Sequence, residues 1–101
     1  MKAYLISAEA QSIEEIDIAG MDDIVKQVGF DTIESDAVGS HGDQLFFDEE
    51  CFLRGSAGRF QIDTLIPVSG RAIVIGTSDG GANLQDVVMD IDDLRSRTKY
   101  L

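Results

Sequence analysis

The chain has 101 residues and carries 8 Lys and Arg against 19 Asp and Glu, a net charge of −11, which suits one acidic domain spanning residues 1–101. So large an acidic excess argues against direct binding to nucleic acid or to an anionic membrane surface, and a single cysteine excludes an intrachain disulfide or a multi-cysteine zinc site. No apolar run approaches the roughly 20 residues of a membrane span or forms a secretory signal, so we expect a soluble, cytoplasmic protein.

The first third of the sequence predicts a β-hairpin followed by a short helix. Residues 2–7 and 12–18 have the composition and alternation of half-buried strands, and the short polar break between them suits a hairpin. The period then changes to that of a helix at residues 21–28, and Gly29 favours a left-handed stop after it. The apolar stripe of this helix consists of Met21, Ile24, Val25 and Val28.

The middle of the chain predicts further strands joined by turns. Residues 31–38 alternate again, residues 39–43 have the composition of a turn, and residues 44–48 have the pattern of the next strand. The glycine-rich residues 55–58 predict the most mobile loop. Residues 60–62 then predict a short edge strand.

The last third of the chain contains the predicted central strand and one ambiguous segment. The uninterrupted β-branched run at residues 72–75 predicts a strand that is buried on both faces, and residues 76–83 then turn the chain. Residues 84–89 form either a second strand paired with the central one or the start of one long helix. We favour the strand, because the preceding turn is rich in Asp and Gly and because Asp90 is a good N-cap for a separate terminal helix.

These elements together predict an α+β fold. It consists of a mostly antiparallel sheet of about five to seven strands, with a short helix after the first hairpin and a carboxy-terminal helix. The order of elements resembles a family of small uncharacterised domains common in phages, plasmids and other mobile elements, and the segments that carry the resemblance are residues 2–6, 46–49, 70–76 and 91–95. The resemblance implies the same fold and a mobile-element origin, and it implies no activity.

No arrangement of residues in the sequence predicts a catalytic centre, a metal site or a cofactor. Cys51 follows three acidic residues, which disfavour a thiolate, and His41 lies in a glycine-rich turn, so a Cys–His pair is not expected. The acidic runs at residues 48–50 and 90–93 lack the spacing of a calcium loop, and residues 76–81 lack the Lys-Ser/Thr pair of a phosphate-binding loop. We therefore expect a protein that is not an enzyme.

The acidic residues themselves are the candidate functional feature. Because an acidic surface accelerates encounter with a basic partner, we predict a non-catalytic accessory or regulatory protein that acts by protein–protein contact. The competing interpretation is that the charges form only a solvated surface. The candidate partner-binding residues are Asp48, Glu49, Glu50, Asp90, Asp92 and Asp93.

Three other interpretations stay open at the level of sequence. The carboxylates can imitate the phosphate spacing of DNA and so occupy the groove of a nucleic-acid-binding protein. Alternatively, the chain is a small carboxylate-dependent enzyme or ligand-binding domain, with its site around residues 55–58. Edge strands at residues 60–63 or in the first hairpin also offer a route to a homodimer.

Overall fold

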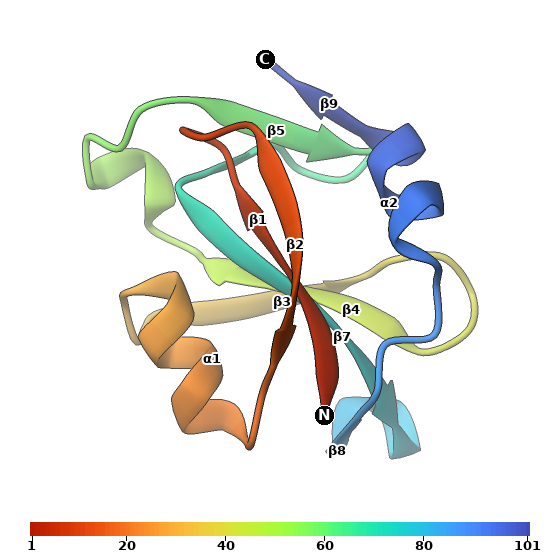
Figure 1. The fold of residues 1–101 in the computed structure, drawn as a ribbon. Helices are drawn as coiled ribbons and strands as arrows, with labels where there is room; N and C mark the ends of the chain where they lie inside the picture. Colours follow the sequence, from red (N-terminus) through yellow and green to blue (C-terminus); the bar gives the residue numbers. More distant parts are fainter.

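A six-stranded antiparallel sheet forms the centre of the protein in the computed structural model, which describes residues 1–101 (Figure 1). Its main path runs β2-β1-β7-β4-β3, and β8 pairs with the far end of β7. The strands are β1 (Lys2–Ser7), β2 (Ser12–Asp17), β3 (Ile33–Ala37), β4 (Asp43–Asp48), β7 (Arg71–Ser78) and β8 (Asn83–Gln85). The predicted α+β class and the mostly antiparallel sheet are therefore confirmed.

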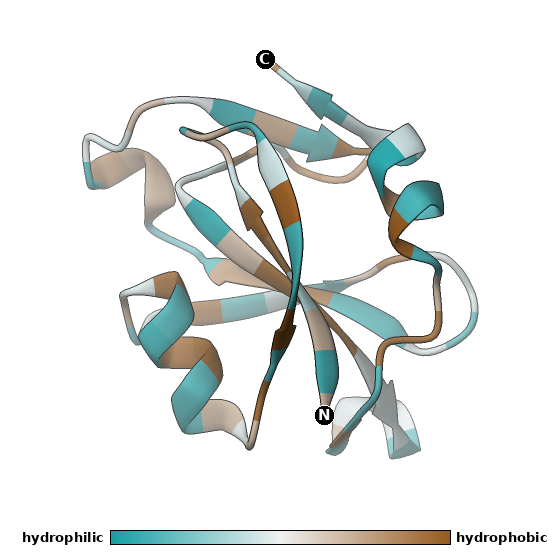
Figure 2. Cartoon of the chain, viewed as in Figure 1, coloured by the Kyte–Doolittle hydropathy of each residue, from teal (hydrophilic) through white to brown (hydrophobic).

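A second, three-stranded sheet and two helices complete the fold. The small sheet has the order β6-β5-β9, with β5 (Arg59–Ile62) between β6 (Val68–Ser69) and β9 (Thr98–Tyr100). The helices are α1 (Met21–Val28) and α2 (Ile91–Arg97), and the short 3-10 turns are η1 (Cys51–Leu53) and η2 (Asp79–Gly81). In Figure 2 both helices alternate between hydrophobic and hydrophilic residues along their length, and neither is long and apolar enough to cross a membrane.

The helix α1 has the bounds that the hydrophobic period predicts. Asp22 and Asp23 lie in its first turn, where negative charge is favourable to the helix dipole. It ends at Gly29, whose φ of 96° is left-handed and whose N–H donates to the carbonyl of Val25 at 2.8 Å. Ile24 and Val28 face the sheet and are buried.

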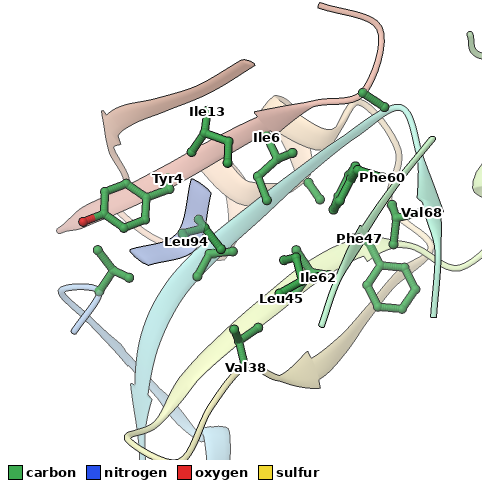
Figure 3. Close-up of a cluster of buried hydrophobic side chains, with 14 of the residues drawn as sticks. Tyr4, Ile6, Ile13, Val38, Leu45, Phe47, Phe60, Ile62, Val68 and Leu94 are labelled. Atoms are coloured by element: carbon green, nitrogen blue, oxygen red, sulfur yellow. The ribbon is translucent and has the colours of Figure 1, made fainter. Parts of the chain in front are cut away.

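The central sheet is buried on both faces because a layer of structure covers each one. On β7, Ile73 and Ile75 pack toward α1, whereas Ala72 and Val74 pack toward the small sheet and α2. This double burial explains the uninterrupted apolar run that marks the central strand in the sequence. The larger cluster is drawn in Figure 3, and its labelled members are Tyr4, Ile6, Ile13, Val38, Leu45, Phe47, Phe60, Ile62, Val68 and Leu94.

One prediction about the small sheet is wrong. Strand β5 is the central strand of that sheet and not an edge, because it pairs with β6 on one side and with β9 on the other. The predicted carboxy-terminal helix is confirmed as α2; it ends at Arg97, and Thr98 turns to extended backbone to begin β9. The two partners of β5 are strands of only two and three residues, and β9 lies at the other end of the sequence from β5's own hairpin, so local pattern does not reveal them.

The segment between β7 and α2 follows the favoured interpretation only in part. Strand β7 runs on to Ser78, so the turn is shorter than predicted, and strand β8 ends at Gln85. The following residues leave the sheet and pass close over Gly76, where an added Cβ would lie 2.1 Å from the Asp86 carbonyl oxygen. Asp90 caps α2 as predicted, and its carboxylate accepts from the N–H of Asp92.

Asp43, which the sequence places in a turn, holds this crossing segment against the sheet. Its side chain is buried, and its two carboxylate oxygens accept from the N–H groups of Val88 and Met89, each at 2.8 Å. The hydroxyl of Tyr4 donates to the carbonyl of Met89 at 2.8 Å from the same side. A buried carboxylate therefore supplies the hydrogen bonds that this irregular backbone would otherwise lack.

Replacing Asp43 with Asn should lower the free energy of unfolding by about 2 kcal/mol, because the amide offers one acceptor to two N–H donors. Urea denaturation measures the change, and the exposed substitution Glu14→Gln, which should stay within about 0.5 kcal/mol of the native protein, is the control. An unchanged urea midpoint for D43N would contradict the structural role given to Asp43.

Candidate functional site

The turn after β4 is organised around the buried carboxylate of Asp48. Its Oδ1 atom accepts from the Thr32 hydroxyl and from the backbone N–H of Glu50, the latter at 3.1 Å. Its Oδ2 atom accepts from Nε of Arg54 at 3.0 Å, and Arg54 also donates to the Thr32 hydroxyl oxygen at 3.1 Å. This network joins Thr32 before β3, Asp48 at the end of β4 and Arg54 after η1.

These donors decide the protonation state of Asp48. Burial alone would raise the pKa of its carboxyl, but hydrogen bonds from Arg54, Thr32 and the Glu50 backbone, with the positive charge of Arg54, lower that pKa below its usual value. The hydrogen bond with Asp48 in turn raises the pKa of Arg54. Asp48 is thus ionised and internally satisfied, so it stabilises the turn and does not form part of an exposed acidic surface.

Glu49 and Glu50, by contrast, are exposed and belong to a larger group of carboxylates. The pKa of Glu49 is raised, first by a side-chain hydrogen bond with Glu34, then by burial and by the charge of Glu34. Glu50 lies 3.5 Å from a guanidinium nitrogen of Arg54, and the charge of Asp31 also acts on Arg54. We call Asp31, Glu34, Glu49 and Glu50 the acidic patch.

The sequence analysis missed Glu34, although the chain contains a signal that locates it. Strands β3 and β4 pair so that Glu34 lies opposite Phe47, and the N–H of Glu49 donates to the Thr32 carbonyl at 2.8 Å. Glu34 and Glu49 are therefore diagonal neighbours across the two strands, within reach of long side chains. A turn at residues 39–42, one residue shorter than the predicted turn at residues 39–43, would have given this register if it had been extended along both strands.

Exposed apolar side chains lie next to the acidic patch. Phe52 and Leu53 of η1 are 49% and 81% exposed, and Phe30, which precedes Asp31, is 37% exposed. The guanidinium of Arg54 lies 4.1 Å from the centre of the Phe30 ring, and that of Arg59 lies 5.0 Å from the Phe52 ring. We call Phe30, Phe52 and Leu53, together with the acidic patch, the η1 surface.

The second predicted acidic group has a structural role in α2. Asp90 is the N-cap of this helix, Asp92 pairs with Arg95 at 3.2 Å, and Asp93 lies 3.6 Å from Arg97. These positions suit the first turn of a helix, where carboxylates are favourable to the dipole. Most of the negative charge of this group is therefore balanced within the helix.

The structure does not bring the two predicted acidic groups together. Asp43 at the start of β4 binds the backbone of Val88 and Met89, just before Asp90, whereas Asp48 ends the same strand. Five residues of extended strand separate these two ends, a distance of roughly 17 Å. The six predicted partner-binding residues thus lie at opposite ends of β4.

A cleft of about 480 Å³ opens beside the η1 surface. It lies between the end of α1, the loop after η1 and the start of β7. Its charged lining residues are Glu9, Asp48, Arg54 and Arg71, its hydroxyl-bearing ones are Ser7, Ser56 and Ser69, and the rest are Val28, Gly29, Phe30, Cys51, Ala57 and Gly70. The cleft therefore includes part of the loop at residues 55–58, which the sequence suggested as an alternative site.

Cys51 and His41 cannot act on each other. Cys51 is buried in the larger core cluster, where its Sγ atom accepts from the N–H of Ser69 at 3.4 Å. His41 lies in the turn before β4, at the other end of that strand from the turn that leads to Cys51. No group of three or more His, Cys, Asp or Glu side chains is arranged to hold a metal ion.

Comparisons of the chain with protein-family models, curated proteins and solved structures find no match. They carry no information on the resemblance to domains of phages and plasmids, which stays a prediction. Any function of the protein is therefore inferred from the geometry of the η1 surface and the cleft.

The Asp48 network should make stability depend on pH in a defined direction. An unfolded Asp has a pKa of about 3.9, and the folded pKa of Asp48 is lower, so its contribution is present above pH ~3.9 and is lost as the pH falls through the folded pKa. Asp48→Asn should lower the free energy of unfolding by about 2 kcal/mol at neutral pH, with a smaller difference in acid. Urea denaturation across this pH range measures it, and a pH-independent difference between D48N and the native protein would contradict the assignment.

Proposed function

We propose that this protein is a non-catalytic accessory protein that binds a partner with a basic surface through the η1 surface. The observation that carries the proposal is the exposure of Phe30, Phe52 and Leu53 directly beside carboxylates that no cation within the protein fully balances. Protein interfaces commonly have an apolar, aromatic centre and a charged rim. The η1 surface has both parts in one place.

The apolar centre of this surface has the composition of an interaction site. Phe52 is about half exposed and Leu53 is 81% exposed, so much of their apolar surface contributes nothing to the stability of the fold. The arginines stacked on Phe30 and Phe52 add planar donors, and aromatic residues and Arg dominate binding energy at interfaces. A partner that covers Phe52 and Leu53 would bury apolar surface that the fold of this chain leaves exposed.

The acidic rim supports a basic partner in particular. Glu34 raises the pKa of Glu49, because the two side chains can form a hydrogen bond only when one of them is protonated and because two ionised carboxylates at this distance repel each other. A Lys or Arg side chain from a partner, placed between them, would remove this repulsion and form charge-assisted hydrogen bonds. The net charge of −11 would also accelerate encounter with a positively charged protein.

Glu49→Gln should affect stability and binding in opposite directions. Because the folded pKa of Glu49 is raised, the ionised pair destabilises the fold once the pH rises through that pKa. The substitution should therefore raise the free energy of unfolding at neutral pH, with no gain in acid, while it weakens partner binding. Urea denaturation at both pH values gives the first quantity, and a loss of stability at neutral pH would contradict the repulsive pair.

Affinity capture from the lysate of the native cell tests the binding itself. The immobilised native protein should retain a basic protein at low salt and release much of it at high salt, since surface charges are screened within about 8 Å at physiological ionic strength. The triple variant with Asp31→Asn, Glu34→Gln and Glu49→Gln should retain much less of the same protein.

A matched control separates the η1 surface from the overall charge. The substitutions Glu14→Gln, Glu15→Gln and Asp22→Asn remove the same amount of charge from β2 and α1, and this variant should bind as the native protein does. Leu53→Ser should weaken capture without a change in charge, because it removes an apolar side chain from the centre. Equal losses in the patch and control variants, or no retained protein at low salt, would overturn the proposal.

A further inference from the structure

Two oppositely charged side chains line the cleft without a partner in the protein. Arg71 forms no ion pair and no side-chain hydrogen bond, and the same holds for Glu9. Their charged atoms are more than 4.0 Å apart, since they do not pair with each other. The other charged pair of the cleft, Asp48 with Arg54, is already joined at 3.0 Å.

The position of Arg71 is fixed by the elements on either side of it. As the first residue of β7 it lies opposite Ser7, the last residue of β1, and Glu9 follows in the turn beyond. Its guanidinium lies over the end of α1, where a Cβ at Gly29 would be 3.6 Å from Nη2. A cation is favourable at the carboxyl end of a helix, so this position favours the exposed Arg71 side chain beside the cleft, where its donors face solvent.

The loop across the cleft also presents unused donors. Ser56 and Ala57 line the cleft and are exposed, and neither their backbone N–H groups nor the Ser56 hydroxyl donates a hydrogen bond within the protein; the same holds for the N–H of the neighbouring Gly55. Arg54 is right-handed helical, with φ −86° and ψ −12°, and Gly55 follows with a φ of +73°. Right- and left-handed residues in succession direct adjacent N–H groups to one side, an arrangement that favours a negative group.

The charge balance of the cleft selects against a simple ion. A plain anion attracted by Arg71 would meet Glu9 and the field of a protein with a net charge of −11. A plain cation attracted by Glu9 would meet Arg71. A molecule that carries both charges on separate groups satisfies both side chains, and the volume of about 480 Å³ is in the range of small-molecule sites.

We infer that the cleft binds a small zwitterionic ligand of the amino-acid class. Its carboxylate contacts Arg71 and the donors of Ser56 and Ala57, and its ammonium group contacts Glu9. The apolar lining at Val28, Phe30 and Ala57 receives the remaining atoms of the ligand. Phe30 belongs to both the cleft and the η1 surface, but no carboxylate of the acidic patch lines the cleft, so ligand binding does not depend on the protein-binding function proposed above.

Titration of the full-length protein followed by two-dimensional amide NMR tests the inference. The probes are the 20 common L-amino acids, each added at millimolar concentrations. At least one of them should produce saturable shifts at the amides of residues 55–57 and 70–71. The N-acetylated and the carboxamide forms of that amino acid should each bind at least about tenfold more weakly, because each lacks one charge.

Matched variants connect the binding to the two charged side chains. Arg71→Gln and Glu9→Gln should each weaken binding of the same amino acid by about tenfold or more. Lys99→Gln and Glu14→Gln, which make the same charge changes outside the cleft, should leave the affinity unchanged. The amide spectrum of each variant shows whether it is folded.

Several results would overturn the inference. One is the absence of saturable shifts at the cleft with every amino acid. Another is binding of acetate or inorganic phosphate as tight as that of the amino acid, with a gain in affinity in E9Q, since this describes a simple anion site. Native affinity in R71Q would equally exclude the proposed contact.

Discussion

The carboxylate of Asp48 is the group on which both proposed surfaces depend. It binds Thr32, Arg54 and the backbone of Glu50 at once, so it fixes the chain before β3 and after β4 in one arrangement. That arrangement positions the acidic patch and the exposed side chains of η1. Arg54 also lines the cleft. Because breaking a buried ion pair leaves an uncompensated charge, loss of Asp48 would disturb both surfaces together.

In the central sheet the middles of the strands form the rigid core, and the residues with candidate roles lie at the strand ends. The middle of β7 is buried on both faces and pairs with β1 and β4 on its two sides, so the sheet holds its own geometry. The residues with candidate roles lie where strands end: Glu49 after β4, Arg71 at the start of β7 and Glu9 after β1. Binding residues in loops positioned by a rigid sheet are the common arrangement in proteins, and here one end of the sheet collects them.

Local pattern predicts the parts of this fold that depend on neighbouring residues. The 3.6-residue period and Gly29 give α1 its bounds, and a β-branched run gives the centre of β7. Features that depend on strand pairing and side-chain packing are different: β5 is central because β6 and β9 pair with its two sides, and Asp48 is buried where Thr32 and Arg54 bind its carboxylate. The sequence identifies Glu49 and Glu50 as candidate binding residues. It does not show that Glu34 lies beside Glu49, or which residues line the cleft, because both follow from the register of the strands.

The acidic residues that produce the net charge therefore have different roles in the protein. Asp43 and Asp48 are buried acceptors, and Asp90 caps α2, so these acids stabilise the fold. The pair formed by Glu34 and Glu49 opposes it, because the charge of Glu34 raises the pKa of Glu49 and neither side chain forms an ion pair. Acids that stabilise the fold explain part of the composition without any partner. The pair that destabilises it has no such explanation, and this asymmetry, more than the total of −11, directs attention to the η1 surface.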